Sequence, residues 1–239
     1  MTQATLIAHC GTRKITRDEL VQIPPPEATA THQPVAHIEV VREIEQSLAF
    51  RQIEVTSEEF AVSPDGMRLF GIMRLAHGFD GGNFAVGLRN SNDKSMRLGL
   101  VAGYRVLVCD NMAFAGDFRP VMAKHTKGLS LADLVTLGVD KIQRNFVNVE
   151  RQIADWKSLE LTDTKAKAII YDAFTGSFRL PRNLIPSIHN RYFDPREEEF
   201  RPRTMWSLSN AFTSALKQLK PVRQFQTTAK LTPFLEAYL

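Results

Sequence analysis

Residues 51 to 111 form a run of short segments in which apolar side chains recur at every second position. This is the spacing of a β-strand, in which successive side chains point to opposite faces. The polar stretches between the segments are short, so neighbouring strands are expected to be antiparallel. The sequence therefore predicts a mostly antiparallel sheet of about five strands, at residues 51–62, 67–75, 84–90, 96–103 and 104–111.

The connections between these strands carry turn signals of their own. Ser63-Pro64-Asp65-Gly66 predicts a tight turn, because proline presets the second position and glycine readily takes a positive φ. A change of phase between Val55 and Phe60 predicts a β-bulge in the first strand. Residues 77–83 are rich in glycine and predict a loop, and residues 91–95 predict a polar turn.

Helical periodicity flanks the strands on both sides. Residues 37–50 are amphipathic, and residues 130–159 begin after Ser130, a good N-cap. Further helices are expected at 162–176, between a Thr162 cap and Gly176, and at 204–219. The helix at 130–159 carries a continuous apolar stripe formed by Ile142, Phe146, Val149, Ile153 and Trp156.

These patterns predict an α+β fold: a mostly antiparallel sheet packed on helices, followed by a helical C-terminal half. Residues 1–36 are expected to be an extended arm, since four prolines occur within residues 22–34. Residues 37–176 form the expected core, and residues 177–239 a loop, a helix and a basic tail. A single domain is expected, with the proline-rich segment 177–203 as the only plausible boundary.

Several classes of protein are disfavoured by the composition. The sequence has no apolar run of membrane-spanning length and no signal-peptide pattern at its start. Its two cysteines, Cys10 and Cys109, cannot form a disulfide framework or a zinc site by themselves, and the six histidines match no metal motif. We therefore expect a cytoplasmic protein without a metal or other cofactor and without membrane association.

The charge is unevenly distributed along the chain. The net charge is +4, but residues 1–60 sum to −4 and residues 177–230 to +6. Such asymmetry is typical of a protein with one surface facing a polyanion, although uneven solvated charge produces the same pattern.

Each of several predicted strands carries an arginine on the face opposite its apolar residues, beside small residues such as Gly87 and Gly99. Arginines in this setting are suited to binding phosphates. The alternative is a half-exposed sheet whose arginines fold over apolar atoms. The candidate nucleic-acid-binding residues are Arg68, Arg74, Arg89, Arg97 and Arg105 on the strands, with Lys124, His125 and Lys127 in the loop that follows.

A catalytic alternative involves Cys109 as a nucleophile and His125 as its base. Cys109 lies on a mostly apolar strand, where free cysteines are usually buried and inert. We therefore assign no catalytic residue.

Four segments, in this order, resemble a phage- and plasmid-encoded family catalogued as domain of unknown function 932. They are residues 24–48, residues 87–114 with Arg89-Asn90-Ser91, residues 123–128 with His125-Thr126, and residues 204–219 with Asn210-Ala211. The chain departs from the family pattern at Asp110-Asn111-Met112. The resemblance implies residence on mobile elements in a bacterial cytoplasm, and it implies no activity.

A further resemblance is one of topology, to the single-strand annealing proteins of phages and of the Rad52 type. It implies binding of single-stranded DNA in a basic groove and assembly into homo-oligomers. Three hypotheses follow. The first is a non-catalytic nucleic-acid-binding protein, for example one that anneals single strands in recombination. The second is a protein-interaction module, such as an inhibitor of host defence, that binds no nucleic acid. The third is an enzyme that uses Cys109 or His125. We favour the first.

Overall fold

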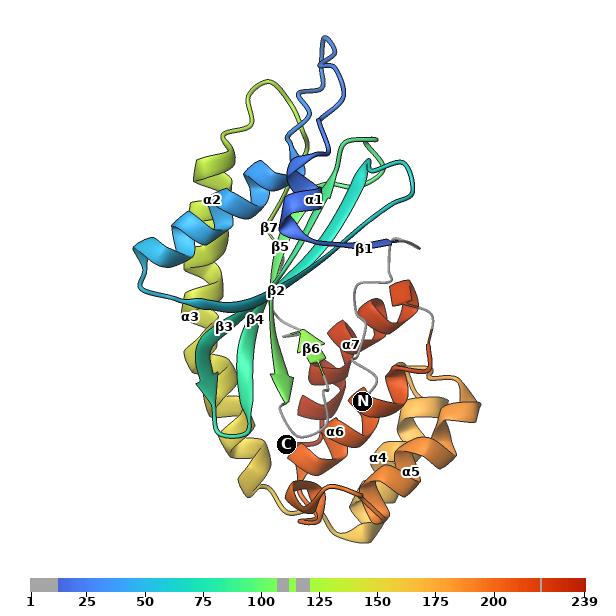
Figure 1. Ribbon diagram of the computed structural model, residues 1–239. Helices are drawn as coiled ribbons and strands as arrows, with labels where there is room; N and C mark the ends of the chain where they lie inside the picture. Colours follow the sequence, from blue (N-terminus) through green and yellow to red (C-terminus); the bar gives the residue numbers. More distant parts are fainter. Residues whose placement is uncertain (1–12, 107–111, 115–120, 220) are drawn as a thin grey trace. The chain divides into compact units, whose positions relative to one another are not determined.

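The computed structural model describes residues 13–106, 112–114, 121–219 and 221–239 (Figure 1). The chain divides into two compact units. The first comprises Met1–Tyr104 and Phe118–Phe146, and the second comprises Arg105–Asp117 and Val147–Leu239. The division falls within a strand and a long helix and not in the proline-rich segment 177–203. A single-domain organisation stays a prediction.

The first unit contains the strands of the sheet other than β6, together with the helices of the N-terminal half. Its elements are β1 (Arg13–Ile15), α1 (Arg17–Val21), α2 (His37–Phe50), β2 (Val55–Val62), β3 (Arg68–Phe79), β4 (Gly82–Ser91), β5 (Leu98–Val106), β7 (Val121–Ala123) and the first half of α3 (Leu131–Ser158). The strands from β1 to β5 neighbour one another in chain order, and β7 pairs with β5. The sheet is antiparallel, which confirms the predicted α+β class.

The first hairpin follows the local signals closely. Gly66 takes a φ of +69°, as the turn requires. The register of β2 against β3 shifts between Val55 and Ser57, which confirms the predicted bulge.

Two predictions about the sheet are wrong in detail. Residues 77–83 are not a loop: β3 continues to Phe79 and β4 starts at Gly82, so a two-residue turn at Asp80 and Gly81 joins them. Gly81 has a φ of +85°, which a glycine adopts without strain. Residues 96–106 contain a single strand, β5, where two strands separated after residue 103 were expected.

Helix α2 and the first half of α3 lie on the apolar face of the sheet (Figure 1). Helix α2 spans the predicted residues, and α3 differs from its predicted bounds by one residue at each end. Phe146 of α3 stacks on Phe84 of β4, with ring centroids 4.1 Å apart. Gly138 permits close approach, since a Cβ atom there would lie 2.8 Å from Leu100 Cδ1. The core of this unit therefore forms between α3 and the face that the alternation predicted to be apolar.

The second unit is helical. Its elements are β6 (Met112–Phe114), the second half of α3, α4 (Asp163–Thr175), η2 (Arg182–Leu184), α5 (Ile185–Phe193), η3 (Glu198–Phe200), α6 (Met205–Leu216) and α7 (Pro221–Glu236). Every residue of α6 is buried, so this helix forms the centre of the unit. Thr162 caps α4 by accepting a hydrogen bond from the Lys165 amide, and the helix ends at Gly176, as predicted.

Two helices of this unit were missed by the sequence prediction. Residues 177–203 were expected to be loop, but they contain α5, which has Pro186 in its first turn. A proline is tolerated there because the first amides of a helix have no partner within the helix. The last twenty residues were expected to be a tail, and they contain α7, which begins at Pro221 and includes Pro233.

Candidate anion-binding site

The register of β3 against β4 places three of the predicted arginines on one face of the sheet. Arg68 pairs with Ser91, Phe70 with Arg89, and Arg74 with Ala85. Paired residues lie on the same face, so Arg68, Arg74 and Arg89 share the face opposite the apolar core.

Two of these arginines have carboxylate partners. The Arg74 guanidinium donates to Glu59 and, at 3.0 Å, to Ser57 Oγ. Arg68 Nε lies 3.5 Å from Asp93 Oδ2. Their charge is therefore already balanced within the chain. Neither acidic residue could be predicted as a partner, because alternation along a strand indicates which face an arginine is on but not what lies beside it.

Arg89 has a different environment. Its Nε donates to the carbonyl oxygen of Arg97 at 3.2 Å, and Nη2 lies 3.0 Å from Met122 Sδ. A Cβ atom added to Gly99 would lie 3.3 Å from Arg89 Nε, so the space expected to receive a ligand holds the Arg89 side chain itself. Burial lowers the pKa of Arg89. Among the described residues, no carboxylate pairs with it.

Two exposed cations lie beside Arg89. In the antiparallel register of β5 and β7, Leu98 pairs with Ala123 and Gly99 with Met122. One step beyond the strand ends, the same register places Arg97 opposite Lys124. Both residues are exposed, and neither forms an ion pair within the described part of the chain. We call Arg89, Arg97 and Lys124 the basic cluster.

The remaining predicted residues differ in their exposure, and none of them is part of the basic cluster. Lys127 is exposed in the loop before α3, three residues after Lys124. Arg105 belongs to β5, but its side chain lies outside the described part of the structure, as does Cys109 altogether. His125 is only 4% exposed, so its ring does not contribute to the surface.

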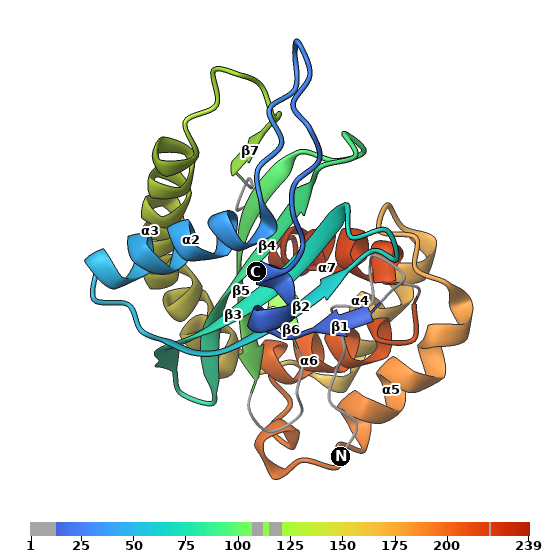
Figure 2. The ribbon, with the colours of Figure 1, turned by 45° about the horizontal axis from the view of Figure 1, so that its top comes forward.

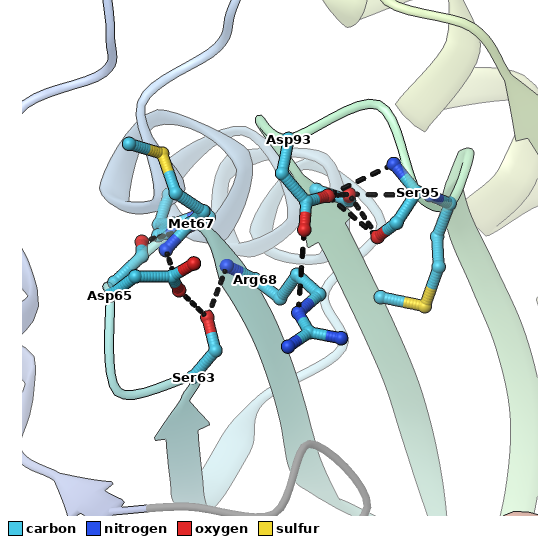
Figure 3. A network of polar contacts seen from close by, with 10 residues as sticks. Ser63, Asp65, Met67, Arg68, Asp93 and Ser95 are labelled. Atoms are coloured by element: carbon cyan, nitrogen blue, oxygen red, sulfur yellow. Dashed lines mark hydrogen bonds and ion pairs between the residues drawn. The ribbon is translucent and has the colours of Figure 1, made fainter.

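The turn before β3 is built around a serine and an aspartate (Figure 3). The Ser63 hydroxyl donates to Asp65 Oδ1 and accepts from the Arg68 amide at 2.9 Å. The Met67 amide donates to Asp65 Oδ1 at 3.1 Å. The hydrogen bond from Ser63 is the main reason that the pKa of Asp65 is lowered.

The turn before β5 repeats this arrangement. The Ser91 hydroxyl donates to Asp93 Oδ1 and accepts from the Met96 amide at 3.3 Å, while the Ser95 amide donates to Asp93 at 2.9 Å. Burial acts to raise the pKa of Asp93, but the hydrogen bonds from Ser91 and Ser95 and the charge of Arg68 outweigh it, so this pKa is lowered. Since Arg68 begins the strand after the first turn, its ion pair with Asp93 joins the two turns (Figure 3).

The chain between α1 and α2, residues 22–36, runs along the end of the sheet where the turns before β3 and β5 lie (Figure 2). We call it the arm. Asn90 and Asn92 both donate to the Val35 carbonyl oxygen, at 2.9 and 3.0 Å. The Val35 amide in turn donates to Asn92 Oδ1 at 3.2 Å. Asparagine side chains from β4 and the following turn therefore fix the arm to the sheet.

Three histidines are buried where the arm meets the sheet: His32, His37 and His125. We call them the histidine cluster. His37 Nε2 donates to the Gly66 carbonyl oxygen at 2.9 Å, and Nδ1 accepts from Asn90 at 2.9 Å. This pattern requires the neutral ring with its proton on Nε2. Burial lowers the pKa of His37, although the hydrogen bond to Gly66 opposes the shift.

His125 is held in its neutral form by its surroundings. Its ring stacks on His32, with centroids 5.5 Å apart and an interplanar angle of 8°. Burial, followed by the charges of His32 and His37, lowers the pKa of His125 to about 4. A histidine in this state is a poor partner for phosphate at neutral pH.

We predict that this shift makes the fold sensitive to acid. The pKa of His125 in the folded protein, about 4, lies below its ordinary value of 6.5, so the unfolded chain takes up the proton first as the pH falls. The stabilisation is therefore present above pH 6.5 and is lost as the pH falls toward 4. Urea unfolding at pH 7 and pH 4.5 should show a loss on the order of 2 kcal/mol.

The His125→Gln variant should lose less stability over the same pH interval. His189→Gln is the matched control, because His189 is exposed in the second unit and its replacement should leave the pH dependence unchanged. Equal pH dependence in the wild type and in His125→Gln would contradict the prediction.

The second unit contains a separate polar concavity of about 470 Å³, at the C-terminal end of α5. It is lined by Ser187, Asn190, Arg191, Asp194, Pro195 and Arg196. The Asp194 carboxylate lies among the two arginines and opposes the binding of an anion there. No three His, Cys, Asp or Glu residues within the described ranges are placed to hold a metal ion. Across those same ranges, no helix has the length and apolar character needed to cross a membrane.

Comparison with known families gives one match. The model of a family described as a domain of unknown function, DUF932, matches residues 28–233. The chain belongs to this family. Searches among curated proteins and among solved structures found no match.

Three named motifs of the DUF932 resemblance fall within the matched residues, and two of them meet at one end of the sheet. They are Arg89-Asn90-Ser91, His125-Thr126 and Asn210-Ala211. Arg89 belongs to the basic cluster, Asn90 binds the arm and His37, and Ser91 builds the second turn. His125 belongs to the histidine cluster and directly follows Lys124. The third motif lies in the second unit, where Asn210 is buried in α6 and donates to the Trp206 carbonyl oxygen. Two DUF932 motifs therefore place the basic cluster beside a network of polar contacts.

Two residues that support this site in the DUF932 chain were not predicted from the sequence. His32 and Asn92 were not singled out, although they lie on either side of the contact between the arm and the sheet. The sequence does contain a repeated pattern at this site: Ser-x-Asp occurs at residues 63–65, before β3, and again at residues 91–93, before β5. Their similarity predicts equivalent turns, and equivalent turns on paired strands lie side by side.

Proposed function

We propose that this DUF932 protein binds the phosphate backbone of nucleic acid through the basic cluster, with single-stranded DNA as the preferred ligand. Binding is electrostatic and needs no covalent chemistry. The proposal places the protein in the cytoplasm of bacteria that carry phages or plasmids, as the family resemblance implies, and gives it a role in recombination.

The observation that carries the proposal is the juxtaposition of Arg97 and Lys124 without a carboxylate partner among the described residues. Like charges opposite each other on neighbouring strands destabilise a sheet. Elsewhere on the same face, Glu59 and Asp93 balance the arginines. A bound phosphate would balance Arg97 and Lys124 in the same way.

The preference for single strands rests on the residues beside the cluster. Phe70 pairs with Arg89 on the same face of the sheet and is partly exposed. Proteins that bind single strands combine cations with aromatic side chains, on which unpaired bases stack and the paired bases of a duplex do not. Assembly into an oligomer, expected from the likeness to annealing proteins, would multiply such sites along a strand.

The alternative function, a protein-interaction module, is less well supported than the binding of nucleic acid. The apolar stripe of α3 that was its expected contact surface is buried within the chain, with no member more than 6% exposed. A partner protein would need to bind elsewhere.

The proposal is tested by fluorescence anisotropy with a labelled single-stranded oligonucleotide and the matching duplex at low salt. We expect saturable binding to the single strand and weaker binding to the duplex. Absence of binding to both would contradict the proposed function, and stronger binding to the duplex would contradict the preference for single strands.

A further inference from the structure

The His32 ring lies between two backbone carbonyl oxygens that belong to different segments. Its Nδ1 is 3.0 Å from the oxygen of His125, in the loop before α3. Its Nε2 is 3.3 Å from the oxygen of Asn92, in the turn before β5. The side chain is buried, with 8% of its surface exposed, so water does not readily replace either contact. One histidine of the arm therefore connects two parts of the sheet end.

The chemistry of these contacts depends on a proton. A carbonyl oxygen only accepts hydrogen bonds, so each ring nitrogen must donate. A neutral imidazole has a single N–H and can satisfy only one of the two oxygens, leaving the other facing a nitrogen lone pair. The imidazolium ion has an N–H on both nitrogens and satisfies both.

The groups that surround His32 are two neutral histidines and the charged side chains of the turn and the loop. His125 stacks on it and is neutral at ordinary pH because its pKa is lowered to about 4. His37 has a single proton, fixed by its contacts with Gly66 and Asn90. The other charged groups on the segments that contact His32 are Asp93 and Lys94 in the turn, and Lys124 and Lys127 in the loop. Asp93, which is next to Asn92 in the chain, is the acidic member of this set and pairs with Arg68.

We propose that His32 is a proton-dependent latch that fastens the arm to the end of the sheet. When His32 is protonated, the arm is bound both to the loop before α3 and to the turn before β5. When the proton is lost, one of the two contacts is broken and the arm loosens at His32. The inference goes beyond the proposed function and does not depend on it.

The other hydrogen bonds of the arm indicate which of its residues should loosen when His32 loses its proton. The Gln33 amide donates to the same His125 oxygen at 3.1 Å, so its exchange with solvent reports directly on the contact with the loop. The contacts of Val35 with Asn90 and Asn92 need no proton from a histidine. Deprotonation is therefore expected to loosen residues 32 and 33 more than residue 35.

The test is NMR spectroscopy of the full chain between pH 5.5 and 8.5. The ring nitrogen shifts of His32 should show protonation at both nitrogens at the lower pH and a single tautomer at the higher pH. Across the same titration, the protection of the Gln33 amide, corrected for intrinsic exchange, should fall about threefold to tenfold, as expected for the loss of one hydrogen bond. The Val35 amide should change less.

His32→Gln supplies the comparison, since glutamine can donate to a carbonyl oxygen at every pH. Its Gln33 protection should be independent of pH, whereas the control His189→Gln should retain the wild-type dependence. Two results would overturn the latch. One is a His32 ring that keeps the same protonation state throughout the titration. The other is a His32 that titrates without any change in the protection of either the Gln33 amide or the Asn92 amide, which donates to the Met67 carbonyl oxygen within the turn. Both are read on the wild type, so the test does not require the variant to fold.

Discussion

Reversing the two exposed charges of the basic cluster, in the double variant Arg97→Glu/Lys124→Glu, is expected to weaken binding of single-stranded DNA about 100-fold at low salt. Each substitution removes a phosphate partner and adds a repulsive charge. Because both side chains are exposed, the fold should tolerate the changes, and thermal unfolding should remain close to that of the wild type. Fluorescence anisotropy measures the loss of affinity.

The control for this experiment is Lys141→Glu/Arg144→Glu. These residues are also exposed and belong to the first unit, but they lie on α3. The control changes the net charge by the same amount, so it separates a local site from a general effect of charge. An equal loss of affinity in both double variants would show that the basic cluster is not the binding site.

Replacing Phe84 by alanine is expected to lower the free energy of unfolding by about 4 kcal/mol. The ring is 1% exposed and stacks on both Phe146 of α3 and His77 of β3. The smaller side chain would leave a cavity between the helix and the sheet, and the surrounding structure would fill it only in part. Chemical denaturation followed by circular dichroism measures the change.

Phe50→Ala is the matched control, since the Phe50 ring at the end of α2 is 86% exposed. The same atoms are deleted there without opening a cavity, and the expected cost is below about 1 kcal/mol. Similar losses from the two variants would contradict the account of the core in the first unit.

The parts of the fold that were predicted correctly are those determined by residues close together in the sequence. Helix α2 and the turn at 63–66 depend on periodicity, proline and glycine over a few positions. Helix α5 was missed because the four prolines of residues 177–203 suggest a loop, although Pro186 falls in the first turn of the helix, where it is compatible with helical structure.

The site was predicted only in part because its contacts connect distant residues. Alternation along the strands placed the arginines on one face, but it could not show that Glu59 and Asp93 neutralise Arg74 and Arg68. The contacts of His32 join residues 93 and 60 positions apart, which no local pattern reveals. Burial of His125 follows from the same contacts, and this is why a residue expected at the surface belongs to the core.

The central claim is that the basic cluster binds phosphates, and the most direct measurement is the salt dependence of binding to a single-stranded oligonucleotide. With three cations engaged, the logarithm of the association constant should fall against the logarithm of the salt concentration with a slope of about −2. The slope should become shallower in Arg97→Glu/Lys124→Glu and remain unchanged in Lys141→Glu/Arg144→Glu. Binding that is insensitive to salt, or a slope that is the same in all three proteins, would contradict the claim.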